Sequence, residues 1–107
     1  MRLHVLPAAA ADILEQSDWY ASKGDVQLAA RWEQAVTATA LGLLDFPNSA
    51  PVNNFAAPEF EGIRQTPVRG FSRHLIFYRT TDSALQIIRV LHGARDLESL
   101  LSGGGET

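Results

Sequence analysis

The segment RHLIFYRTTDSALQIIRVLH (residues 73–92) has the pattern of two hydrophobic strands joined by a polar turn. Residues 73–79 carry four apolar side chains in succession, which is typical of a central strand buried on both faces. Residues 84–92 alternate, as a strand with two distinct faces does. The predicted faces of this strand are Leu85, Ile87 and Leu91 on one side and Ile88 and Val90 on the other. The segment therefore predicts two neighbouring strands at the centre of a sheet.

The first 45 residues predict a strand and a helical hairpin. Residues 2–6 alternate in hydrophobicity as a short strand does. Apolar residues then recur at helical spacing as far as residue 22, where Lys23-Gly24 is a typical helix end. Asp25 is a candidate N-cap for a second helix, whose apolar residues recur every three or four positions up to residue 43. Two consecutive helices joined by a tight turn are therefore expected.

The remaining pieces complete one α+β domain. Residues 47–61 hold three of the five prolines and are typical of an irregular connection. Residues 62–68 predict a strand that Pro67 confines to a sheet edge or a bulge. The predicted order β-α-α-β-β-β indicates an N-terminal helical hairpin packed on a small antiparallel sheet. We expect a single domain over residues 1–101 and a flexible tail over residues 102–107.

Composition excludes several classes of function. The 107 residues contain no cysteine, which rules out disulfides, thiolate metal sites and thiol nucleophiles, and which fits a reducing cytoplasm. The histidines at positions 4, 74 and 92 are too dispersed for a metal-binding motif, and no phosphate-cradling loop is present. No apolar run reaches the roughly 18 residues needed to span a bilayer. The sequence predicts a cytoplasmic protein without metal, cofactor or membrane contact.

The charge of the chain is divided along the sequence. The formal net charge is -3, which argues against a generic or sequence-specific nucleic-acid binder, because such proteins are usually basic. Within residues 62–95, however, a single aspartate accompanies six arginines: Arg64, Arg69, Arg73, Arg79, Arg89 and Arg95. Each guanidinium offers a fixed fork of donors suited to carboxylates or phosphates. An acidic partner on this half of the chain is therefore expected.

Several segments together resemble the RelE/ParE superfamily of bacterial toxins, and the ParE branch in particular. The resemblance runs from about residue 3 to residue 101. The segments that carry it are Ala11-Asp12-Ile13 with Tyr20, Leu44 to Pro47, Gly62-Ile63-Arg64, Ile76-Phe77-Tyr78-Arg79, and the run from Ile88 to Asp96.

This resemblance implies a toxin of a type II toxin–antitoxin system. The implied partner is a small antitoxin, often a ribbon-helix-helix repressor whose acidic C-terminal segment wraps around the toxin. ParE toxins inhibit DNA gyrase, whereas RelE-type toxins cleave mRNA on the ribosome. The fold alone does not separate these two activities, because function depends on the residues of the site.

The sequence favours a toxin that acts by binding, with no catalytic residues. A nuclease needs a proton-transfer group and cations for the scissile phosphate, for which His92 or His74 and Arg64, Arg73 or Arg95 are candidates. RelE-type nucleases commonly add a catalytic tyrosine near the C-terminal end, but no tyrosine follows Tyr78 here. The alternative therefore remains a RelE-type endonuclease that uses His92, Arg64 and Arg95. A chain that binds antitoxin but is no longer toxic is a third possibility.

The predicted partner-binding residues are the six arginines and Trp19. A solvated sheet face with scattered ion pairs is the competing interpretation of the arginines. Arg89 and His92 would lie on opposite faces of an ideal strand, which divides the predicted patch. Trp32 lies on the apolar stripe of its helix and is expected in the core. Trp19 lies off the stripe of its own helix, so it is either an exposed anchor for a partner or packs beneath the loop at residues 48–58.

Overall fold

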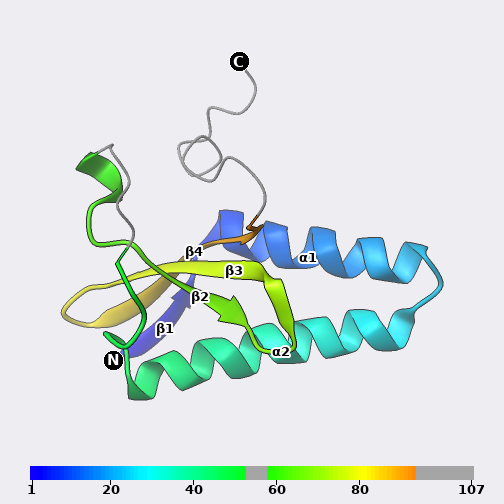
Figure 1. Ribbon diagram of the computed structural model, residues 1–107, viewed down its shortest axis with the longest axis horizontal. Coiled ribbons are helices and arrows are strands. Elements are labelled where there is room, and N and C mark those ends of the chain that lie inside the picture. Colours follow the sequence, from blue (N-terminus) through cyan, green and yellow to red (C-terminus); the bar gives the residue numbers. More distant parts are fainter. Residues whose placement is uncertain (53–57, 94–107) are drawn as a thin grey trace.

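The fold is described from a computed structural model of the chain, which places residues 1–52 and 58–93. Two helices follow the first strand, and three further strands follow the helices, as expected (Figure 1). The predicted tail at residues 102–107 and the end of the predicted domain lie outside the described residues. The elements are β1 (Arg2–Val5), α1 (Pro7–Ser22), α2 (Val26–Asp45), the 3-10 helix η1 (Pro58–Phe60), β2 (Arg64–Val68), β3 (Phe71–Thr80) and β4 (Ala84–His92).

The four strands form one mixed sheet in the order β1-β4-β3-β2. The expected α+β class is confirmed, but the sheet is not wholly antiparallel, because β1 pairs in parallel with β4. The antiparallel neighbours are the strands joined by short turns, β2 with β3 and β3 with β4. β1 and β4 are separated in the sequence by both helices and two strands, and the local sequence pattern does not encode the direction in which two such distant strands pair.

Both helices pack on one face of the sheet, where the larger core lies. Trp32 of α2 is fully buried as expected, and its indole Nε1 donates to the carbonyl of Ile13 in α1 at 3.0 Å. Ile76 and Tyr78 of β3 and Ile87 of β4 meet this core from the sheet. In Figure 1, the connection between the two helices projects beyond the sheet, so the far end of the hairpin has no strand beneath it.

A second buried cluster covers the opposite face of the sheet. It is formed by Phe60, Ile63, Phe77 and Leu91, with Leu75 and Ile88 packed against it. The predicted faces of β4 are therefore correct as far as Ile88 and wrong beyond it, since Val90 joins the helix-side core and Leu91 the opposite one. The cause is a bulge: Phe77 pairs with Arg89 but Tyr78 with Ile87, so β4 holds one extra residue and its alternation is reset.

The helix hairpin begins and ends where its residues predict. Gly24 has the positive φ of 85° that a left-handed turn after α1 requires, and Asp25 then caps α2 by accepting the backbone N–H of Leu28 at 2.9 Å. β2 is an edge strand with a register shift at Pro67, as expected from that proline. Its free edge meets the backbone carbonyl of Pro51, which accepts the N–H of Gln65 at 3.3 Å.

Candidate functional site

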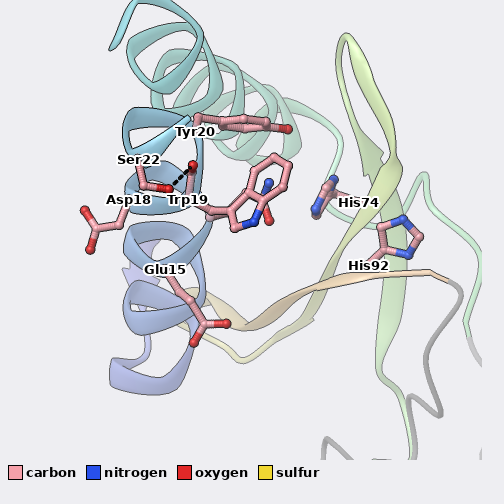
Figure 2. A pocket seen from close by; sticks show the side chains of 8 residues that line it. Glu15, Asp18, Trp19, Tyr20, Ser22, His74 and His92 are labelled. Carbon is pink, nitrogen blue, oxygen red and sulfur yellow. Dashed lines mark hydrogen bonds between the residues drawn. The ribbon is translucent and has the colours of Figure 1, made fainter. Parts of the chain in front are cut away.

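A cleft of about 720 Å³ lies between α1 and the neighbouring ends of β3 and β4 (Figure 2). Glu15 and Trp19 share its helix wall because residues four apart lie on one face of a helix. Figure 2 shows the Trp19 ring pointing into the space beside His74, whereas the Asp18 carboxylate points away from it. The lining side chains are those of Glu15, Gln16, Asp18, Trp19, Tyr20, Ser22, His74 and His92.

Two histidines form the strand wall of the cleft. His74 and His92 are paired in register on β3 and β4, and their ring centroids are 5.2 Å apart in an edge-to-face arrangement. The ring of His74 also lies 4.8 Å from that of the buried Trp32. Both rings are thus held in place from the core while they line the open cleft.

Trp19 is the exposed aromatic residue of the helix wall. Its side chain is 55% exposed, and its ring meets that of Tyr20 at 5.6 Å between centroids. The Nζ of Lys23 lies 5.5 Å from the indole centroid, a cation–π distance. Trp19 is therefore exposed at the end of α1 and is not buried beneath the described residues of the loop at 48–58; its role as an anchor for a partner stays a prediction.

Arg89 is committed to an ion pair with Asp12 of α1. Its Nε and Nη2 donate to the two carboxylate oxygens at 2.7 and 2.9 Å, and this hydrogen bonding raises the pKa of Arg89 above its ordinary value. The sequence places Arg89 and His92 on opposite faces, but both line one small cavity of about 160 Å³ beside α1. Pairing is regular from Arg89 to His92, and Arg89 reaches this cavity through its ion pair with Asp12 of α1.

Arg64 holds the loop that follows α2. Its Nη1 donates to the carbonyls of Asn48 and Ala50 at 3.1 and 2.5 Å. The buried phenol of Tyr78 donates to the carbonyl of Pro47 at 3.1 Å. Burial raises the pKa of Tyr78 above 10.0, and the charge of Arg64 opposes part of that rise. Arg64 thus has a structural role in addition to any contact with a partner.

The residues of the predicted nuclease set are not brought together. In the sheet, Arg64 is the register partner of Tyr78 and His92 that of His74. These two positions of β3 are four residues apart. Extended chain rises about 3.3 Å per residue, which sets them roughly 13 Å apart along the strand. Arg95, the third member, lies outside the described residues.

The other described arginines of the set occupy two different surroundings. Arg69 and Arg73 are exposed on either side of the turn between β2 and β3. The Nε of Arg79 is buried and has no hydrogen-bond partner among the residues that the structure places. Among the predicted partner-binding arginines that the structure describes, Arg69 and Arg73 are thus the exposed ones.

An apolar groove of about 320 Å³ between α1 and α2 was not foreseen from the sequence. Leu14 is 58% exposed at its rim, and Val5 of β1 is exposed beside it. Val36 forms part of its floor. The departure of Leu14 from the buried stripe depends on the angle between the helices, which helical periodicity does not reveal.

Two further classes of site are absent from residues 1–52 and 58–93. There, no three histidine, aspartate or glutamate side chains are arranged to hold a metal ion. No helix of this part of the chain has both the length and the hydrophobicity that crossing a membrane requires.

Comparisons with known proteins place the chain in a family. Residues 3–97 match the family described as the ParE toxin of the type II toxin–antitoxin system, parDE. A similar solved structure, the "Chromosomal ParDE TA system from P. aeruginosa", has a TM-score of 0.71 and 21% identity, covering 86% of this chain and 95% of that chain. No curated protein matches. Since the family match spans most of its length, the chain belongs to the ParE toxins of type II toxin–antitoxin systems.

Proposed function

We propose that this toxin binds and inhibits DNA gyrase in the cytoplasm and that a cognate antitoxin neutralises it. The observation that carries the proposal is the match to the ParE family over residues 3–97. Gyrase is the target that resemblance to this branch implies. Action by binding is supported by the separation of Arg64 from His92. The other described nuclease candidates, Arg73, His74 and His92, do line one pocket.

Two surfaces support binding of an antitoxin with acidic and apolar side chains. The groove between α1 and α2 leaves Leu14 and Val5 exposed to a partner that would bury them. Arg69 and Arg73 are exposed and would form charge-assisted hydrogen bonds with carboxylates. A ribbon-helix-helix antitoxin with such a C-terminal segment would contact both surfaces and associate more slowly as the salt concentration rises.

Induction of the chain alone in bacteria tests the gyrase target. We expect an SOS response and gyrase trapped on cleaved DNA, both reversed when the antitoxin is co-expressed. Purified toxin should inhibit supercoiling by gyrase in vitro. Normal supercoiling at a large excess of folded toxin would contradict the proposal, and growth without inhibition would instead favour a chain that has kept antitoxin binding and lost toxicity.

Ribosome-dependent cleavage of mRNA is the alternative function. One observation favours it: the paired His74 and His92 face an open cleft with an exposed aromatic ring, a setting suited to stacked bases. Primer extension on translated messages distinguishes the two functions. Discrete cuts that disappear in both His92→Ala and Arg64→Ala would establish the nuclease, provided that both variants keep the wild-type melting temperature.

A further inference from the structure

A second groove, of about 410 Å³, lies between the C-terminal half of α2 and the turn that joins β2 to β3. It is separate from the cleft at α1 and from the apolar groove between the helices. Arg69 lines it from the turn, and Gly42 and Phe46 line it from α2. Hydroxyl groups of Thr66 and Ser72 complete the polar part of its wall.

The guanidinium of Arg69 lies directly against α2 at Gly42. A Cβ added at Gly42 would stand 2.8 Å from the Nη2 of Arg69, closer than non-bonded atoms approach. Glycine is unfavourable inside a helix relative to alanine. Here its missing side chain leaves the space that the guanidinium occupies.

The backbone of Arg69 is tied to the same helix. Its N–H donates to the hydroxyl of Thr39 at 3.1 Å, and that hydroxyl donates to the carbonyl of Ala35 at 2.7 Å. The base and the tip of the Arg69 side chain are therefore both held against α2. Such a pre-positioned cation loses less conformational freedom on binding than a solvated arginine does.

The donors in this groove are not used within the described part of the chain. There, neither the guanidinium of Arg69 nor the hydroxyls of Thr66 and Ser72 make a hydrogen bond or ion pair. No aspartate or glutamate lines the groove. Phe46, at its rim, is 71% exposed and offers an apolar surface next to these donors.

We propose that this groove binds a carboxylate side chain of the antitoxin, with Arg69 as the cation and Phe46 packing against the neighbouring apolar side chain of the same segment. The inference rests on the proposed function, since it names where one acidic residue of that partner binds. The guanidinium and the two hydroxyls that line this groove are donors that a carboxylate accepts.

A protein carboxylate fits this groove better than a nucleic-acid backbone does. A polynucleotide requires a run of cations along its phosphates, whereas the groove contains one arginine among apolar and hydroxyl groups. The net charge of -3 also repels a polyanion as a whole. A single acidic side chain within a partly apolar peptide matches both the charge and the exposed ring of Phe46.

Gly42→Ala is the most informative variant, because it separates binding from stability. Alanine favours the helix, so the melting temperature should stay the same or rise, while the new methyl group displaces the guanidinium from its place on α2. We expect the dissociation constant of the full-length antitoxin to rise about tenfold in Gly42→Ala and Arg69→Ala, and less in Arg69→Lys. Arg31→Ala removes an exposed arginine that lies on α2 outside the groove. This variant should bind the antitoxin as the wild type does.

Two further measurements separate the possible failures. Wild-type antitoxin affinity in both Gly42→Ala and Arg69→Ala would overturn this inference and leave the proposed function standing, whereas a wild-type toxin that binds no antitoxin would overturn the proposed function. The Arg69 side-chain N–H resonance should shift with a hexaglutamate peptide and not with a DNA dodecamer. A shift with DNA alone would replace the carboxylate by a nucleic-acid phosphate and overturn the inference.

Discussion

Asp12 is the residue on which the α1 side of the sheet depends most. β1 ends at Val5, so β4 has no strand neighbour on that side after Ile87. The carboxylate of Asp12 takes the place of the missing strand: it accepts the backbone N–H of Val90 at 3.0 Å as well as two bonds from Arg89. One side chain thus satisfies both the exposed backbone and the cation next to it.

Replacing Asp12 by alanine should destabilise the protein strongly. The change leaves the partly buried Arg89 and the Val90 N–H without their acceptor, which costs roughly 3 kcal/mol of unfolding free energy. Urea denaturation monitored by tryptophan fluorescence measures it. Asp18→Ala, an exposed carboxylate in the next turns of the same helix, is the matched control and should change stability little.

Tyr78 gives the protein an alkaline limit of stability. Because burial raises the pKa of Tyr78, the folded state keeps a proton that the unfolded state releases above about pH 10. The stabilisation is thus complete below pH 10 and is lost as the pH rises toward the folded-state pKa. Tyr78→Phe should lose about 1 kcal/mol at pH 8 through the bond to Pro47, yet lose less than the wild type between pH 8 and 11. Equal losses in the two proteins would contradict this account.

At the scale of elements, helical periodicity predicts the two helices, and short apolar runs bounded by turn residues predict the strands that are buried on both faces. The bounds of β4 agree with the prediction, and β2 has its predicted irregularity at Pro67. The bulge at Ile88 could not be predicted, because an extra residue in a strand changes no local propensity. That one bulge placed Leu91 on the face of the sheet opposite Ile87.

The start of α2 tests the capping prediction at this scale. Asp25→Ala removes the acceptor for the Leu28 N–H and should lower the unfolding free energy by about 1 kcal/mol. Asp45→Ala, at the other end of the same helix, is a control with the same change of charge. Asp45→Ala should not destabilise the protein, because a negative charge at the C-terminal end of a helix interacts unfavourably with the helix dipole and the substitution removes that charge. Chemical denaturation of both variants compares the two ends.

At the scale of the whole molecule, the sheet is buried on both faces although the helices cover only one. Phe77 is fully buried on the face opposite the helices, among residues from η1, the segment after it and β4. Phe77→Ala should therefore cost about 3–5 kcal/mol, as for a central core residue. Phe46→Ala removes a ring of the same size that is mostly exposed, and its melting temperature should stay near that of the wild type. A loss of unfolding free energy in Phe77→Ala as small as that in Phe46→Ala would mean that the second cluster contributes no stability.

The candidate site was less predictable than the fold. The run of arginines in residues 62–95 is visible in the sequence, but the use of each one depends on its distant neighbours. Arg89 meets Asp12, which lies 77 residues earlier, and Arg64 meets the carbonyls of a loop. Trp19 is exposed, which is one of the two alternatives that its position off the apolar stripe left open. A single sequence does not show which residues far apart in the chain contact each other in the fold.

The central position of β4 also determines when the protein can acquire its structure during synthesis. β4 lies between β1 and β3, yet it is the last described strand to leave the ribosome. A nascent chain that stops before Ala84 has a first strand with nothing to pair with, and both buried clusters lack the residues that β4 supplies. Because such distant pairing must wait for this segment, the toxin domain can fold only after β4 has been synthesised. Ribosome-bound fragments ending before β4 therefore lack the assembled surfaces on which its partners would act.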